Sequence, residues 1–277
     1  MKKIRKPLAE INGEEVYVQC VLSYKDEKKQ TKLMGYRDII SRVTKDYGKS
    51  IPHNFSGFNH PEYTVETKKE MSSVYTDCFV EKRVGGFYDS IMENAHGLCP
   101  FCGEGVPRNL DHFLPKSNYP FLSVTPENLV PSCRDCNMEK SSIKPSNNDD
   151  VPLHPYYDKI DVVWIAVCLD FSRSEYIGVS YYNCLDEKDS IAGRIDAHIK
   201  AHALKSTFET HANSMLNSEK RSHKKLAEQS YDTLRKHLCE ELESFEADDI
   251  NSWRSALYRE LVAKYQEYAE WLIRYRK

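Results

Sequence analysis

The sequence predicts an α+β protein that is mainly helical, and three observations lead to this fold class. Through most of the second half of the chain, apolar residues recur at every third or fourth position, which is the period of a helix with one buried face. Two β-rich runs, 161–170 and 175–184, flank a short polar turn and predict one hairpin. Ahead of the hairpin, four cysteines mark a small unit that a metal ion can close.

Composition limits the class of protein. The chain has 277 residues and a formal net charge of −3. This length can bury a substantial core in one domain or two. The slightly acidic balance argues against binding nucleic acid through overall charge, because that binding needs Lys and Arg to neutralise phosphates. The sequence contains no run of about eighteen apolar residues, so it predicts no membrane helix. Met1–Pro7 lacks the apolar core of a signal peptide. We therefore expect a cytoplasmic protein with no membrane association.

The N-terminal region is expected to be mostly helical with one strand. The segment 16–22 is rich in β-branched and aromatic residues, which favours the strand. Helical spacing predicts helices over about 31–48 and 64–81, and a short helix after Gly85-Gly86. The whole chain is expected to fall into four regions: 1–95, the N-terminal region; 96–160, a metal-bearing core; 161–188, the hairpin; and 189–277, a C-terminal helical region.

The first candidate metal site consists of Cys99, Cys102, Cys133 and Cys136. Two C-x2-C pairs can each form a tight turn that directs two thiolates to one point, and together they supply the tetrahedral sulfur set that Zn2+ prefers. Four protein ligands leave no open position, so we expect a structural zinc. The alternative is two disulfides or four buried thiols, which the absence of a secretory signal disfavours.

A second candidate site lies between the two cysteine pairs. Asp111 and His112 are adjacent, and adjacent side chains of a strand point to opposite faces. One can therefore hold a cation while the other faces a reacting water. Asn137 follows the last cysteine, at the start of a short expected helix. Oxygens from Asp111 and Asn137 would form an incomplete shell of hard ligands, which suits Mg2+ or Mn2+. The ordinary pKa of a histidine suits His112 as a general base.

The segment Cys99–Lys140 resembles the HNH nucleases, also called His-Me finger or ββα-metal nucleases, in the McrA-like branch with a four-cysteine zinc. The resemblance rests on the cysteine pairs, Asp-His, a downstream Asn and a Cys-Asn-x-x-Lys end, all in order. It implies a ββα-metal core in which His112 activates water and Asp111 and Asn137 bind the catalytic cation. It also implies that Asn128 ties the β-hairpin and orients His112. Asn137 replaces the second His of the family pattern, and its amide oxygen favours Mg2+ or Mn2+ over Zn2+ or Ni2+.

The function predicted from these residues is a divalent-metal-dependent endonuclease that hydrolyses phosphodiester bonds, with DNA favoured over RNA as substrate. Lys116, Arg134 and Lys140 are candidates for holding phosphates, and solvated surface charge is the alternative for each. Two other hypotheses stay open. One is a zinc-finger module that binds nucleic acid without cleaving it, and the other is a nonenzymatic assembly protein.

One motif beyond the cysteines remains without a derived role. It reads Leu153-His154-Pro155-Tyr156-Tyr157-Asp158. His154 is a candidate for reaching the metal pocket or a phosphate. A packing role for this histidine and its two tyrosines is the alternative.

The C-terminal helices carry a stripe of large apolar residues. Packing against the preceding helix is one interpretation, and an interface with a second copy or another protein is the other. McrA-like proteins are often parts of systems that restrict phage or foreign DNA, some paired with an ATPase, so the resemblance makes a homo-oligomer or an ATPase partner at these helices plausible. The stripe comprises Trp253, Leu257, Leu261, Tyr265, Tyr268, Leu272 and Tyr275.

A balance of charges across the core also points to a partner. A balanced site should hold DNA weakly at physiological salt, because each phosphate contact needs its own cation. Between Cys99 and Pro145, five basic residues offset five acidic ones: Arg108, Lys116, Arg134, Lys140 and Lys144 against Glu104, Asp111, Glu127, Asp135 and Glu139.

Overall fold

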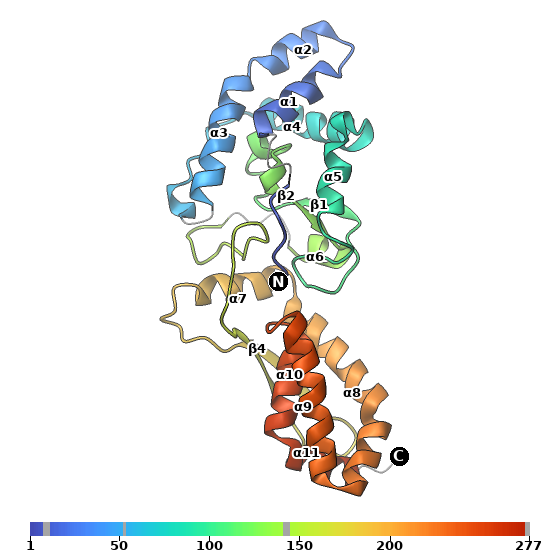
Figure 1. Ribbon diagram of the computed structural model, residues 1–277. Helices are drawn as coiled ribbons and strands as arrows, with labels where there is room; N and C mark the ends of the chain where they lie inside the picture. Colours follow the sequence, from blue (N-terminus) through green and yellow to red (C-terminus); the bar gives the residue numbers. More distant parts are fainter. Residues whose placement is uncertain (8–11, 52–53, 141–144, 275–277) are drawn as a thin grey trace. The chain divides into compact units, whose positions relative to one another are not determined.

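The computed structural model describes residues 1–7, 12–51, 54–140 and 145–274 (Figure 1). The chain divides into two compact units, Met1–Lys159 and Ile160–Lys277, called here the N-terminal and C-terminal units. Each unit combines helices with a small antiparallel sheet. The predicted α+β, mainly helical class is therefore right. The N-terminal helices and the metal-bearing core share one unit, and the hairpin and the C-terminal helices share the other. Tyr275 and Lys144 lie outside the described residues.

The N-terminal unit contains a short hairpin followed directly by a helix. Its helices are α1 (Gly13–Leu22), α2 (Glu27–Met34), α3 (Arg37–Ser50), α4 (Val65–Ser73), α5 (Phe87–Glu93) and α6 (Arg134–Glu139). Its shorter elements are η1 (Phe55–Gly57), the π-helix η2 (Val74–Glu81), η3 (Val84–Gly86), η4 (Pro120–Leu122) and η5 (Pro126–Asn128). Strand β1 (Asn109–His112) pairs antiparallel with β2 (Leu129–Ser132). Figure 1 shows β1, β2 and α6 grouped together, with α5 beside them.

The expected strand at 16–22 is wrong, because this segment belongs to helix α1. Asn12 caps the helix by accepting a hydrogen bond from the backbone N–H of Glu15 at 3.0 Å. Val16, Tyr17, Cys20 and Val21 are buried. That spacing fits one face of a helix, which packs against α3. The local cap and the tertiary packing override the β propensity of the valines.

The other N-terminal helices differ from expectation at their boundaries. The predicted helix over 31–48 is two helices, with α2 ending before Gly35 and α3 beginning at Arg37. The predicted helix over 64–81 begins at its cap, Thr64, as α4, and it continues as the π-helix η2. The short helix predicted after Gly85-Gly86 is present as α5.

The C-terminal unit consists of the predicted hairpin and a group of helices. Strand β3 (Ile165–Asp170) pairs antiparallel with β4 (Gly178–Asn183). The helices are α7 (Ala192–Ala201), α8 (Leu204–Gln229), α9 (Tyr231–Asp248), α10 (Trp253–Ala263) and α11 (Tyr265–Arg274). Helices α8 to α11 lie side by side (Figure 1), with α10 against β3 and α8 against β4.

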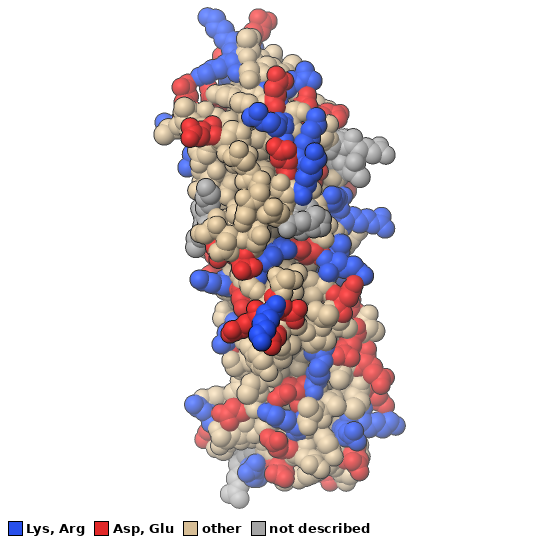
Figure 2. Space-filling model, turned by 90° about the vertical axis from the view of Figure 1, so that its left-hand side faces the viewer, with Lys and Arg blue, Asp and Glu red and all other residues tan. Residues whose placement is uncertain are grey.

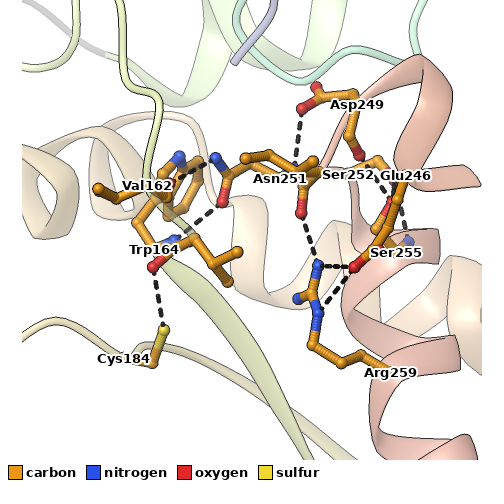
Figure 3. Close-up of polar contacts among 11 residues, drawn as sticks. Val162, Trp164, Cys184, Glu246, Asp249, Asn251, Ser252, Ser255 and Arg259 are labelled. Atoms are coloured by element: carbon orange, nitrogen blue, oxygen red, sulfur yellow. Dashed lines mark hydrogen bonds and ion pairs between the residues drawn. The ribbon is translucent and has the colours of Figure 1, made fainter.

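The corner between α9 and α10 holds the start of the hairpin (Figure 3). The side chain of Asn251 accepts a hydrogen bond from the backbone N–H of Trp164 at 2.9 Å and donates to the carbonyl of Val162 at 2.9 Å. Arg259 donates to the carboxylate of Glu246 at 2.6 Å, which joins the two helices across the corner. These contacts tie the start of the hairpin to the corner between the two helices.

The apolar stripe of the last helices lies inside the C-terminal unit. Leu257, Leu261, Tyr268 and Leu272 are fully buried, and Trp253 is 3% exposed. The packing interpretation of the stripe is therefore right for these residues, and they offer no surface to a partner. Within the described part of the chain, no helix has the length and apolarity needed to cross a membrane.

Candidate functional site

The four predicted zinc ligands form a buried cluster. Each contributes one Sγ atom, and these atoms all lie within 4.8 Å of one another. The sulfurs of Cys102 and Cys133 are 3.9 Å apart. Zn–S bonds of about 2.3 Å in a tetrahedron require sulfur separations of about 3.8 Å, so the cluster fits a zinc ion with little adjustment. Four buried cysteines that can bind zinc are thus brought together from segments thirty residues apart.

Backbone groups prepare these sulfurs to carry negative charge. The backbone N–H of Gly105 donates to the sulfur of Cys102 at 3.3 Å. Cys133 caps helix α6, and its sulfur accepts from the N–H of Cys136 at 3.5 Å. Hydrogen bonding with Cys102 lowers the pKa of Cys99 to about 7. Contacts with the other three sulfurs raise the pKa of Cys136, so a bound cation would be needed to hold all four sulfurs as thiolates.

The hairpin brings Asp111 and His112 to the wall of one pocket. In the β1–β2 register, Asp111 lies opposite Val130 and His112 lies opposite Leu129. Both residues line a pocket of about 470 Å³, called here the β1 pocket. Asn137, from α6, and Lys116 line it as well. The three residues predicted to act around the catalytic cation therefore border a single cavity.

His112 has a defined tautomer. Its Nε2 lies 2.9 Å from the carbonyl oxygen of Ser123, and because a carbonyl can only accept, Nε2 carries the proton. The lone pair is then on Nδ1. His112 is only 7% exposed, and burial, with repulsion from Lys116 and Lys140, lowers its pKa to about 3. The imidazole is therefore neutral at physiological pH and has an accepting nitrogen.

Asn128 holds the loop that positions the acceptor for His112. It is fully buried, and its side-chain oxygen accepts from the backbone N–H of Leu114 at 2.7 Å. Its amide nitrogen donates to the carbonyl oxygens of Leu114 at 3.1 Å and Leu122 at 3.3 Å. The next carbonyl, that of Ser123, accepts from His112. Asn128 thus fixes the segment after β1 to the turn that orients the imidazole.

Asp111 is paired with a lysine. The Nζ of Lys140 lies 2.7 Å from Asp111 Oδ2, and it also donates to the carbonyl oxygen of His112. The two side chains are 7% and 12% exposed. Burial raises the pKa of Asp111 despite the nearby ammonium. Lys140, a candidate for holding phosphate, is engaged with the carboxylate instead.

Two residues with oxygen donors border the β1 pocket. Asp111 and Asn137, whose side chains carry hard oxygen donors, are both among the residues that line the β1 pocket. Such ions are commonly held by one or two protein ligands, with water and phosphate filling the remaining positions. Among the described residues, three or more His, Cys, Asp or Glu side chains lie close enough together to hold a metal only in the cysteine cluster. The β1 pocket thus suits an ion that needs few protein ligands.

The remaining phosphate candidates differ in position. Lys116 lines the β1 pocket, and partial burial lowers its pKa. Its Nζ lies 4.4 Å from the ring centroid of Tyr75. Arg134 is exposed at the start of α6 and is not among the residues that line the pocket. Tyr75, from the segment predicted as a helix over 64–81, also lines the pocket, and no sequence motif marks it as a site residue.

His154 has the packing role that was one of its two interpretations. It is fully buried, and its ring centroid lies 4.0 Å from that of Phe113. Its Nε2 is 3.0 Å from the hydroxyl of Tyr47 on α3, and its Nδ1 accepts from the backbone N–H of Tyr156 at 3.2 Å. Asp158 accepts from the backbone N–H of His154 at 2.6 Å. The motif therefore supports the residue next to His112 from behind the hairpin.

Comparison with known proteins gives two partial similarities. The chain is 42% identical over 97 residues to protein ea31 of Escherichia phage lambda. The aligned segment covers 34% of this chain and 33% of ea31. It is 36% identical over 58 residues to Septu protein PtuB of Bacillus thuringiensis, and this aligned segment covers 19% of this chain and 23% of PtuB. The chain thus matches about a third of one relative and about a quarter of the other. No family model matches the chain, and no solved structure matches it.

Proposed function

We propose that this protein is a divalent-metal-dependent HNH endonuclease that hydrolyses phosphodiester bonds, with DNA as the favoured substrate. One observation carries the proposal. Asp111, His112 and Asn137 border one pocket on a hairpin followed by a helix, and the same helix carries two cysteines of the buried cluster. This combination matches the order and spacing expected of a zinc-stapled ββα core.

The protein groups have distinct roles in this proposal. His112 Nδ1 accepts a proton from the attacking water, while the bond from Nε2 to Ser123 keeps the ring in place. Asp111 and Asn137 would hold the cation. When bound, Mg2+ or Mn2+ supplies the positive charge that stabilises the transition state at phosphorus and the departing oxygen. The structural zinc would have no direct part in the reaction, because its four sulfur ligands leave no open position.

The low pKa of His112 bears on this role. An imidazole whose pKa is about 3 is always available as the neutral base at physiological pH, but it is a weak proton acceptor. An anionic phosphate in the pocket would offset the repulsion from Lys116 and Lys140 that contributes to this low pKa. His112 should therefore become a stronger base when substrate binds.

One face of the molecule carries charges of both signs. The described residues drawn in Figure 2 mix Lys and Arg with Asp and Glu, so the face in view has no extended patch of one sign. Lys116 is the lysine placed at the β1 pocket for direct phosphate contact. We therefore propose that a second copy or a partner protein, such as an ATPase, adds to substrate binding. The similarity to PtuB favours a setting in defence against phage.

A plasmid nicking assay with Mg2+ or Mn2+ tests the proposal. The full-length protein should convert supercoiled DNA to nicked or linear forms, and chelation of the divalent ion should stop the reaction. A matched His112→Ala preparation that cuts equally well would identify a contaminating nuclease. If the protein binds DNA but never cuts DNA or RNA with either metal, the zinc-finger binding module is the better hypothesis. Neither binding nor cutting would favour the assembly protein.

A further inference from the structure

Tyr75 lies between the two functional side chains of the β1 pocket and the protein core. Its ring centroid is 4.5 Å from that of His112, with the planes inclined at 63°. Its other close polar neighbour is Lys116, whose Nζ lies 4.4 Å from the ring centroid. The hydroxyl of Tyr75 donates to the carbonyl oxygen of Leu110 at 3.3 Å, which ties the ring to strand β1. The tyrosine is 8% exposed.

The contact with His112 restricts the imidazole. The bond from Nε2 to Ser123 fixes one atom of the ring, but it still allows the ring to tilt about that atom. An aromatic ring packed edge-on at 4.5 Å limits this tilt and has a favourable geometry of its own. Together, the two contacts determine where Nδ1 points. A general base needs this control, because its nitrogen must come within hydrogen-bond reach of the water.

The contact with Lys116 places a positive charge at the same pocket. An ammonium over a tyrosine ring is attracted by the negative face of the ring. Lys116 is partly buried, which lowers its pKa, and it follows the strand that bears His112. The ring therefore holds a flexible side chain at the pocket that the substrate phosphate would enter.

The element that supplies Tyr75 is unusual. Residues Val74–Glu81 form a π-helix, η2, which continues directly from α4. Helices of this type are rare and occur frequently at functional sites, since the additional residue in each turn redirects side chains. Here Tyr75, Thr76 and Val80 line the pocket, while Val74, Cys78 and Phe79 are buried. One short segment thus provides both a core face and a pocket wall.

We infer that Tyr75 is a positioning residue for the cleavage reaction. It orients the imidazole of His112 and holds the Lys116 ammonium for the substrate phosphate. This inference rests on the proposed nuclease function. It adds to the catalytic centre a residue from outside the cysteine-bounded segment Cys99–Lys140, on an element of the N-terminal helical region.

The experiment measures kcat and KM for cleavage of a fluorescein-labelled DNA duplex with Mn2+, using full-length variants. Tyr75→Leu removes the ring but keeps an apolar side chain, and it should lower kcat about tenfold or more through misplacement of the base. Tyr75→Phe keeps the ring and loses only the bond to Leu110, so its kcat should stay within about twofold of wild type. Rescue by phenylalanine would separate ring packing from hydroxyl chemistry.

A matched control removes a neighbouring ring. Phe79 is fully buried in the same π-helix and stacks on Tyr75, with centroids 5.7 Å apart, but it does not line the pocket. Phe79→Leu should lower the melting temperature while leaving kcat within about twofold of wild type at a temperature where the protein is folded. An equal loss of kcat in Phe79→Leu and Tyr75→Leu would reduce Tyr75 to general packing and overturn the inference.

The lysine contact has its own readout in KM. Lys116→Met should raise KM, and adding Tyr75→Leu to Lys116→Met should raise it no further, because the ring would act on KM through the lysine. Additive effects would overturn this part of the inference. If the wild-type protein cleaves DNA and Tyr75→Leu has the same kcat, the positioning role is refuted and the proposed nuclease function stands. A wild-type protein that never cuts would refute the proposed function, and the inference with it.

Discussion

Lys140 and Asp111 form an ion pair at the β1 pocket, with the ammonium nitrogen 2.7 Å from the carboxylate oxygen and both side chains largely buried. A divalent cation that binds Asp111 must compete with this ammonium or displace it. In the proposed cation site, the pair would therefore lower the affinity of Asp111 for the metal.

Lys140→Met should separate these two effects. Without metal, the variant should lose about 3 kcal/mol of unfolding free energy, because removing one partner leaves a buried carboxylate unpaired. Its affinity for Mn2+ should rise, since the competing charge is gone. Thermal unfolding with and without Mn2+ measures both effects. Weaker Mn2+ binding than in wild type would mean that Lys140 supports the cation instead of competing with it.

Cys133→Ser should remove the zinc and destabilise the N-terminal unit. The substitution breaks the sulfur set and changes the cap of α6. We expect the zinc content to fall from one per chain to near zero and the unit to lose about 5 kcal/mol or more of stability. Metal analysis and calorimetry measure these quantities. Cys168→Ser, at an exposed cysteine outside the cluster, is the control. Unchanged zinc content in Cys133→Ser would contradict the ligand assignment.

His112→Ala and Asp111→Ala should have different phenotypes. His112→Ala should abolish cleavage while Mn2+ and zinc still bind, because the imidazole acts on water. Asp111→Ala should weaken Mn2+ binding, so that a higher Mn2+ concentration partly restores cleavage. Isothermal titration and cleavage rates across a Mn2+ series distinguish them. An equal loss of Mn2+ affinity in both variants would refute this division of roles.

The C-terminal unit should lose stability as the pH falls from about 6.5 to about 4. His223 is 1% exposed, and burial together with nearby His237 lowers its pKa from 6.5 to about 4. As the pH falls, His223 is therefore protonated near pH 6.5 in the unfolded chain but only near pH 4 in the folded chain. Stability is fully present above pH 6.5 and falls below it, by about 3 kcal/mol in total.

Calorimetry of the full chain across this pH range tests the prediction. His223→Gln stays neutral and should flatten the pH dependence of the second unit. His96→Asn replaces an exposed histidine of the N-terminal unit at a positive φ that asparagine tolerates, and it should leave that dependence unchanged. Identical pH profiles for wild type and His223→Gln would show that another group is responsible.

Much of the fold could be predicted because its signals are local. The hairpin β3–β4 and helix α5 follow from short runs of sequence, and the cysteine spacing anticipates the buried cluster. The β propensity of Val16 and Val21 wrongly predicts a strand for helix α1, because the cap at Asn12 and burial against α3 decide the structure. The roles of Asp111, His112 and Asn137 remain predictions, although the structure brings the three residues to one pocket.

What could not be predicted depends on contacts between distant segments. Tyr75 meets His112 across 37 positions of sequence, and its π-helix has no sequence signal of its own. The pairing of Lys140 with Asp111 depends on how α6 returns to β1. The burial of Tyr268 and Trp253 likewise appears only once α8 to α11 are assembled. Deleting 252–277 would therefore remove core residues of the C-terminal unit, so it would not test for a docking surface.

Helix α6 is short, but both of its ends carry residues of the candidate site. Cys133 caps its start, Cys136 and Asn137 lie within it, and Lys140 caps its end. The segment that carries two cysteines of the cluster thus also supplies Asn137 to the β1 pocket. Oxidation of the sulfurs or withdrawal of zinc would release both together. In the proposed nuclease, loss of zinc from the cysteine cluster would therefore also remove the cleavage activity.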